Sequence, residues 1–309
     1  MRRTYRKKSK KRRTMRRTSK RFYKSKIKSK TKSKTKTKPF RMIDGHMVID
    51  VPLDKEVHKL SKASKKHFYE GYAYSDNIKR FFNIILKKLP KKLLYFPTFP
   101  LKKEWGERFD KKNMFLYMDD IIKRKESKSD LDSLDAIKQV LSGAGFSLED
   151  EIDKGISQKY RYIAIILGIG SSRWSAGHQN IVIFDTKKKE VELFEPHGGY
   201  GKSEIGWYHD ISYIMERFVH FMFEDYKYIS PKEFLPKHEL QGKVTGPYCI
   251  TWCMMYLHYK LLNKDIPSKT IIKRMRQIDK TFLLRYMKFI ENTIKNRKTK
   301  YKSKPIKTV

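Results

Sequence analysis

Cysteine is scarce in this chain of 309 residues, which has only Cys249 and Cys253. Two cysteines cannot build a framework of several disulfides, and so low a number is typical of a reducing compartment. A zinc site made of four cysteines is excluded for the same reason. The thiol chemistry open to this chain is therefore that of individual cysteines.

Long apolar runs are also missing. The longest uncharged apolar run, from Tyr162 to Gly170, has nine residues, well short of the ~20 that a membrane-spanning helix requires. The basic N-terminus has no apolar stretch behind it, as a secretory signal peptide would. We therefore expect neither membrane insertion nor secretion.

Acidic residues are absent from both ends of the chain. Residues 1–38 hold 21 basic and no acidic residues, and residues 295–309 hold 7 basic and no acidic residues. The middle, residues 39–294, has 44 basic and 33 acidic residues, and 39% of the whole chain is hydrophobic. This composition predicts a mildly basic folded body with a sizeable core between two cationic tails.

The segment 1–38 is too polar to bury a core, so we expect a disordered tail. Many Lys and Arg residues without acidic neighbours favour binding to the backbone of a nucleic acid, or to another polyanion, without reading its sequence. A solubilising tail or a nuclear localisation signal is the alternative.

Residues 39–152 are predicted to form a helical accessory lobe. Ile78, Phe81, Phe82 and Ile85 recur at the three- and four-residue intervals of an amphipathic helix. The segment contains no catalytic constellation, and we expect it to shape a substrate groove.

Residues 153–294 are predicted to form a mixed α+β domain. Apolar and β-branched runs at 160–170, 178–185 and 190–196 predict strands, the last two joined as a hairpin. A helix over 204–225, a short strand at 226–230, a helix from about 247 to 262 and a last helix at roughly 268–294 complete the predicted order.

The predicted hairpin brings polar groups together. If its turn centres between Lys187 and Lys188, Asn180 faces Glu195 and His178 faces His197. Alternation along the strands then places all four side chains on one face, with His178 and Glu195 as diagonal neighbours. A carboxylate beside an imidazole is the base–orienter half of a nucleophilic triad, and His197 is the alternative base. A one-residue slip of register would break this arrangement.

Cys249 is the candidate nucleophile. With Thr245 or Gly246 as N-cap and Pro247 in the first turn, Cys249 lies at a helix N-terminus, where the dipole favours a thiolate. The alternative is an inert buried cysteine, a role that we assign to Cys253 one turn later.

The order of these residues resembles the Ulp1-type cysteine peptidases, which include SUMO-specific proteases and the adenoviral and poxviral processing proteases. In that family a His begins one hairpin strand, an acidic residue or Asn ends the next, a Gln follows later, and the catalytic Cys opens a buried helix. His178, Glu195, Gln241 and Cys249 take those places within residues 160–262, and the 17-residue step from His178 to Glu195 matches the family's usual spacing.

The sequence also departs from that pattern. Gln179 stands where the family usually has Trp, Tyr248 and Ile250 replace the Asp and Gly that usually flank the Cys, and Gln241 lies eight residues before Cys249, further than is usual. The succession HxN, FEPHG and GPYC is also similar to uncharacterised proteins of large DNA viruses.

The resemblance implies a papain-like cysteine peptidase in which Cys249 attacks a peptide or isopeptide carbonyl and His178 transfers the proton. Glu195 would hold the imidazole, and Gln241 or backbone amides would stabilise the oxyanion. Implied substrates are viral structural precursors or ubiquitin-like conjugates, with no cofactor and no metal. The implied location is the virion, or the cytoplasm or virus factory of an infected cell, with the nucleus as an alternative.

A second class of function remains open at this stage. The same tail and the same fold suit a non-enzymatic, nucleic-acid-binding virion protein built on an inactive peptidase fold. The two classes differ in the reactivity of Cys249.

The 21 uncompensated basic residues of the tail generate the first prediction. Deleting residues 1–38 should weaken binding to duplex DNA and flatten its salt dependence, because log K falls with log salt in proportion to the phosphates neutralised. Fluorescence anisotropy across a salt series measures both quantities. An unchanged affinity and an unchanged salt slope would contradict a role for the tail in binding.

Overall fold

The computed structural model describes residues 40–43, 46–49, 75–86, 93–97, 114–117, 133–141, 147–171, 174–199, 207–236, 240 and 248–302. The tail predicted at 1–38 lies outside these residues, as do the last seven residues of the basic C-terminus.

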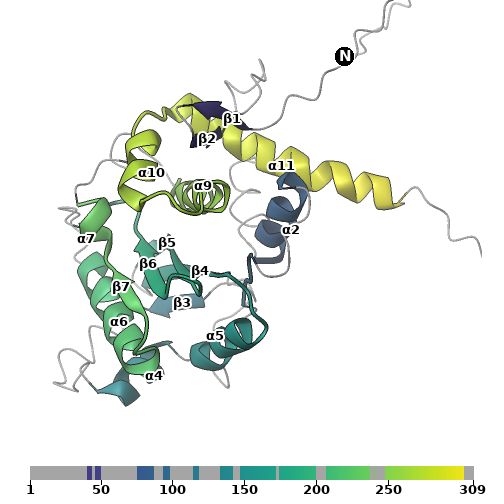
Figure 1. The fold of residues 1–309 in the computed structure, drawn as a ribbon. Coiled ribbons are helices and arrows are strands. Elements are labelled where there is room, and N and C mark those ends of the chain that lie inside the picture. The colour runs from purple at the N-terminus through teal and green to yellow at the C-terminus, as the bar shows by residue number, and fades with distance from the viewer. Residues whose placement is uncertain are drawn as a thin grey trace, which may run out of the picture. The chain divides into compact units, whose positions relative to one another are not determined.

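The described residues form a mixed α+β structure, as the sequence predicted (Figure 1). The strands of its main sheet lie in the order β3-β4-β5-β6-β7. Their bounds are β3 (Met114–Tyr117), β4 (Tyr162–Ser171), β5 (Trp174–Asp185), β6 (Glu190–Phe194) and β7 (Lys227–Ile229). The inner pairs β4–β5 and β5–β6 are antiparallel, whereas β3 and β7 join the sheet in parallel with β4 and β6. A separate two-stranded hairpin consists of β1 (Phe40–Ile43) and β2 (His46–Ile49).

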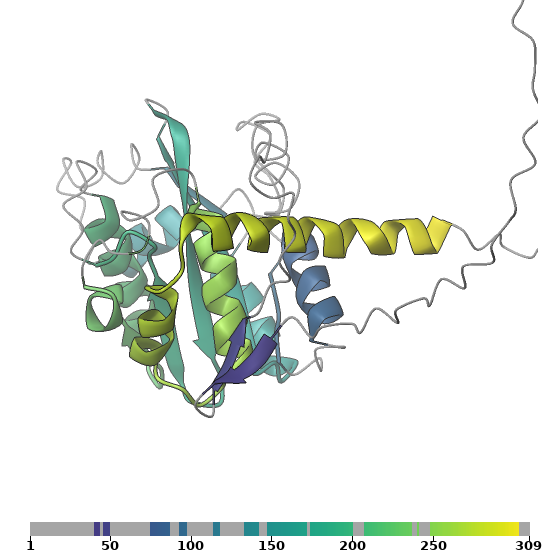
Figure 2. The same ribbon diagram turned by 90° about the horizontal axis from the view of Figure 1, so that it is seen from above.

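Helices cover both faces of the main sheet (Figure 1). One core cluster joins the sheet to α2 (Ser75–Ile85), α7 (Pro231–Phe234), α9 (Cys249–Leu262), α10 (Ser268–Met275) and α11 (Lys280–Lys302). The cluster on the other face includes α4 (Leu134–Leu141), α5 (Leu148–Ser157) and α6 (Trp207–Met222). Figure 2 shows α11 crossing over α9 and α2, which it contacts.

Strand β4 explains the apolar run in the middle of the sequence. Tyr162 and Ala164 pack in the cluster around α9, while Ile163 and Ile165 pack in the cluster around α6. Since both faces of the strand are buried, it needs no alternation of polar and apolar residues.

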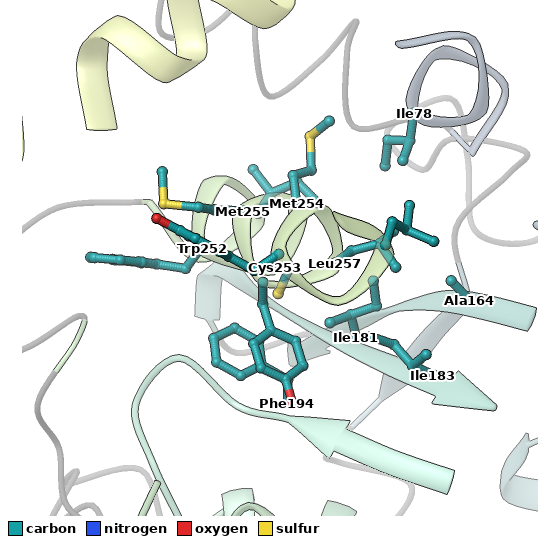
Figure 3. Close-up of a cluster of buried hydrophobic side chains, with 14 of the residues drawn as sticks. Ile78, Ala164, Ile181, Ile183, Phe194, Trp252, Cys253, Met254, Met255 and Leu257 are labelled. Carbon is teal, nitrogen blue, oxygen red and sulfur yellow. The ribbon is translucent and has the colours of Figure 1, made fainter. Parts of the chain in front are cut away.

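Helix α9 is buried along its whole length: all fourteen of its residues lie in the interior. Its sequence CITWCMMYLHYKLL has apolar residues on every side, which is typical of a helix enclosed by other elements. In Figure 3, Cys253 lies on the side of α9 that faces Phe194 of the sheet, and Met254 lies on the side away from the sheet. The structure thus encloses the helix that begins at the candidate nucleophile.

The boundary predicted at residue 152 does not separate a helical lobe from the α+β domain. Strand β3 pairs with β4 of the main sheet, and Phe81 and Phe82 of α2 pack in the same core cluster as α9. The prediction missed this because the parallel pairing joins strands about fifty residues apart, so no local pattern signals it.

The last predicted helix, 268–294, is two helices in the structure. The chain turns between Met275 and Lys280, and the Asp279 side chain accepts a hydrogen bond from the N–H of Phe282, at 2.7 Å, in the first turn of α11. An Asp that accepts from the backbone in this way is a helix N-cap. Helix α11 then continues to Lys302, into the segment predicted to be a basic tail. Among the described residues, no helix is both long enough and apolar enough to cross a membrane.

His258 lies in an aromatic environment between three helices. It is fully buried in α9, its Nδ1 lies 3.1 Å from the hydroxyl of Tyr286 on α11, and its ring contacts Phe81 and Phe82 of α2 edge-on. Burial lowers the pKa of His258 to about 3. The folded protein therefore holds this imidazole in its neutral form at neutral pH.

His258 should make the fold sensitive to acid. An imidazole in the unfolded chain has a pKa of ~6.5, so its contribution to stability is complete above that pH and is lost as the pH falls towards about 3. Between the two values, one such group makes stability fall by up to ~1.4 kcal/mol per pH unit. Urea unfolding of the parent and of His258→Phe between pH 4 and 6.5 should show a shallower slope in the variant. Equal slopes would contradict the assignment.

Candidate active site

The β5–β6 hairpin has the register that the sequence predicted. Ile181 faces Phe194 and Asp185 faces Glu190, so the strands are paired about a centre between Lys187 and Lys188. The one-residue slip is thereby excluded. Asp185 helps to set this turn, because its Oδ1 accepts hydrogen bonds from the N–H groups of Lys187 and Lys188, at 3.1 and 3.2 Å.

The hairpin brings His178 and Glu195 into direct contact. The Nε2 atom of His178 lies 2.8 Å from Oε1 and 3.0 Å from Oε2 of Glu195. Both side chains are buried, with 7% of His178 and 1% of Glu195 exposed. A carboxylate accepts and cannot donate, so Nε2 carries the proton of this bond. The other ring nitrogen, Nδ1, is the atom through which the ring can bond to a second partner.

The turn after β6 fixes the carboxylate. The N–H of His197 donates to Glu195 Oε1 at 2.8 Å, and the N–H of Gly198 donates to the carbonyl oxygen of Glu195 at 2.9 Å. Gly198 has a φ of 86°, in the region that favours glycine. A Cβ on Gly199 would lie 2.5 Å from the backbone nitrogen of Lys232, so glycine is needed there for the turn to pack against α7.

Helix α7 is the support that the sequence prediction missed. Its N-cap Ser230 and the third helical residue Glu233 form a capping box, with Pro231 in the first turn. The sequence signal was present, since Ser followed three residues later by Glu is the usual pattern of such a box. The N–H of Gly199 also donates to the carbonyl oxygen of Leu235, just after this helix, at 2.8 Å.

Cys249 is the first residue of α9. Its N-cap is Tyr248, without a side-chain hydrogen bond, rather than Thr245 or Gly246 as predicted. The prediction placed the helix start too early because it followed Pro247, which lies outside the described residues. Cys249 is still in the first turn, where backbone N–H groups have no partner within the helix, and it is 5% exposed.

The charges around His178 favour its imidazolium form. Burial alone would lower the pKa of His178, but the charge of Glu195, a hydrogen bond with Cys249 and the hydrogen bond with Glu195 outweigh it and raise the pKa to about 10. His178 thus interacts with both Glu195 and Cys249. That these three residues act together in catalysis stays a prediction.

The other candidates have different surroundings. The ring of His197 lies beside that of His178, with centroids 4.9 Å apart, and its backbone N–H donates to Glu195. Cys253 is fully buried and its Sγ–H donates to the carbonyl oxygen of Gln179 at 3.4 Å. Burial, followed by the charges of Cys249 and Glu195, raises the pKa of Cys253 well above its usual value. Gln241 lies outside the described residues, so its role in an oxyanion hole stays a prediction.

Comparison with known proteins gives one sequence relative and several similar structures. No family model matches the chain. A "Putative ankyrin repeat protein L371" of Acanthamoeba polyphaga mimivirus is 29% identical over 136 residues, which cover 37% of this chain and 17% of that protein. The chain thus spans less than a fifth of the length of this relative.

The similar structures include a bacterial effector protein and a SUMO protease. The Chlamydia trachomatis effector ChlaDUB1 matches with 11% identity over 79% of this chain and 91% of its own, at a TM-score of 0.38. The SUMO protease Ulp1 matches with 12% identity over 78% of this chain and 98% of its own, at a TM-score of 0.35.

The contact between His178 and Glu195 generates the next prediction. Glu195→Gln should lower turnover by about 10²- to 10⁴-fold with the fold intact, since an amide can bond to the ring but cannot stabilise its cation. Glu190→Gln, at the other end of β6, is the matched control and should keep full turnover. Asp185 is unsuitable as a control because it holds the turn and pairs with Arg161. Equal losses in both Gln variants would refute the assignment.

Proposed function

We propose that this protein is a cysteine peptidase that cleaves peptide or isopeptide bonds with Cys249, His178 and Glu195. The observation that carries the proposal is the buried hydrogen bond of His178 Nε2 to Glu195, with the same imidazole interacting with Cys249 at the start of a buried helix. A nucleophile, a base and a group that orients the base are the components of covalent catalysis of acyl transfer.

The reaction follows from these positions. In the resting pair the proton of the Cys249 thiol is on His178, and the thiolate sulfur attacks the carbonyl carbon of the substrate. The resulting imidazolium, held by Glu195, returns the proton to the departing amine and leaves an acyl-enzyme. His178 then takes a proton from water, whose oxygen attacks the acyl carbon and releases Cys249.

The developing oxyanion needs hydrogen-bond donors. The backbone N–H of Cys249 is one candidate because it belongs to the unpaired first turn of α9. The side chain of Gln241 is the second. Each such donor is typically worth ~2.7–4 kcal/mol in the transition state.

For the substrate we propose conjugates of ubiquitin-like proteins, with viral structural precursors as the alternative. One similar structure is that of the Chlamydia effector Cdu1 bound to ubiquitin, and others are of the SUMO protease Ulp1. The mimivirus relative supports a viral origin, and with it the virion or an infected cell as the location. Nucleic acid, bound through residues 1–38, is the second proposed partner because of the uncompensated basic charge there.

Selective alkylation of Cys249 tests the pairing of thiol and imidazole. An unassisted thiol titrates near ~8.5, so labelling by iodoacetamide at about pH 6, mapped by mass spectrometry, should occur at Cys249 and spare the buried Cys253. In His178→Ala, Cys249 should not be labelled at that pH and should be labelled only in more alkaline buffer. Release of a fluorophore from the C-terminus of ubiquitin or SUMO should be lost in Cys249→Ala and His178→Ala.

Two outcomes would refute the proposed function. Labelling that is equal at both cysteines, or indifferent to His178, would mean that the thiol and the imidazole do not act as a pair. The same conclusion would follow if hydrolysis persisted in Cys249→Ala. The non-enzymatic virion protein would then be the better description.

A further inference from the structure

One stripe of α9 faces the β5–β6 hairpin. Its members Cys249, Cys253, Tyr256 and Lys260 follow one another at intervals of four, three and four residues. Residues at these intervals share one face of a helix. We call these four residues the α9 stripe.

The α9 stripe meets β5 at the end where β6 has stopped. The Sγ–H of Cys253 donates to the carbonyl oxygen of Gln179, next to His178. If the pairing of β5 with β6 continued beyond Phe194, Gln179 would face Pro196, which has no N–H to donate. The thiol of Cys253 therefore takes a place that the hairpin leaves open.

The next member of the stripe binds β6. The ring of Tyr256 stacks on that of Phe194 with centroids 4.2 Å apart and an interplanar angle of 6°. Its hydroxyl donates to Glu192 Oε2 at 2.9 Å. Tyr256 is thus bound both to the residue that precedes Glu195 and to a carboxylate on the same strand.

Lys260 completes the contacts. Its Nζ lies 2.9 Å from Oε1 and 2.8 Å from Oε2 of Glu192, and 3.2 Å from the hydroxyl of Ser268 in α10. The Ser268 hydroxyl also donates to Glu192 Oε1, at 2.5 Å. Glu192 and Lys260 are 5% and 6% exposed. The buried carboxylate of Glu192 thus accepts hydrogen bonds from three side chains. Because hydrogen bonds depend on angle, the network favours one orientation of these side chains.

Apolar packing alone does not fix the rotation of α9. All of its residues are buried, and hydrophobic burial has no preferred direction. A shift of one residue would turn the helix by ~100° about its axis, since a turn contains 3.6 residues. Such a shift would carry Cys249 away from His178. Directional bonds between α9 and the hairpin oppose this shift.

We propose that the network of Glu192, Tyr256, Lys260 and Ser268 positions Cys249 against His178 by fixing the rotation and register of α9 on β6. This inference rests on the proposed function and deepens it. Glu192 lies in β6, three residues before Glu195, and Lys260 lies in α9, eleven residues after Cys249. The network therefore joins the strand that leads to the orienting carboxylate and the helix that carries the nucleophile.

The test replaces the whole network with apolar groups of similar size: Glu192→Leu, Tyr256→Phe, Lys260→Met and Ser268→Ala. Exchanging a complete buried ion pair for apolar residues is often neutral or stabilising, so the midpoint of thermal unfolding should not fall. The value of kcat should fall by ~10²-fold with KM little changed, because small misplacements of reacting groups have costs of this size. Labelling of Cys249 at about pH 6 should fall to the level of His178→Ala.

A matched control removes another partly buried ion pair. Glu291 of α11 is 5% exposed and pairs with Lys288 and Lys295, in a helix without any site residue. Glu291→Leu with Lys288→Met should leave kcat and labelling unchanged. Tyr256→Phe alone, which removes a single hydroxyl, should give a smaller loss of kcat at an unchanged unfolding midpoint.

The outcomes separate this inference from the proposed function. The parent protein must first show labelling that depends on His178, and without it the proposed function fails. If the parent shows it and the apolar variant keeps both kcat and labelling, the positioning role is wrong. If kcat falls in the apolar variant and in Tyr256→Phe only together with a lower unfolding midpoint, the network has a structural role alone.

Discussion

The burial of α9 between the main sheet and the helices α2 and α11 is the constraint on which the rest of the structure depends. The helix has no solvent-facing side, so the sheet, α2, α10 and α11 must all supply apolar contacts to it. Apolar contacts of this kind stabilise the position of the helix but do not favour one rotation of it about its axis. The polar groups within this core therefore fix the orientation of α9. They include His258 towards α11, and Tyr256 and Lys260 towards β6.

The candidate site lies where this helix begins and the hairpin ends. Because β6 stops at Phe194, the next residues turn back through Gly198, and the carboxylate of Glu195 is held by the N–H of His197. The same end of the hairpin leaves Gln179 free to accept from α9. The end of β6 thus has two effects: it positions the carboxylate of Glu195, and it leaves β5 open to contact with the helix that carries Cys249. The short motif FEPHGG contains the residues that end the strand and form the turn after it.

The sequence allowed the prediction of those features that depend on neighbours along the chain. The register of the hairpin followed from the TKKK turn and from strand alternation, and it placed His178 beside Glu195 as the structure has them. Pairing between distant segments was not predictable in this way, so β3 was missed. The start of α9 was misjudged because proline and threonine signalled an earlier cap than Tyr248. No periodicity distinguishes Lys260 as a buried cation, because its partner Glu192 is 68 residues away.

Buried charge at this site has a cost that the fold offsets only where each group is paired. His178 with Glu195, and Lys260 with Glu192, are both buried ion pairs at the contact of the hairpin with α9. Taking such charges out of water costs several kcal/mol per ion, about as much as a well-made pair returns. Exchanging a buried ion pair for apolar residues is often neutral or stabilising. Two such pairs lie on the elements that lead to Glu195 and Cys249. Their contribution to stability does not explain them as well as their effect on geometry does, because paired charges fix how the hairpin and α9 lie against each other.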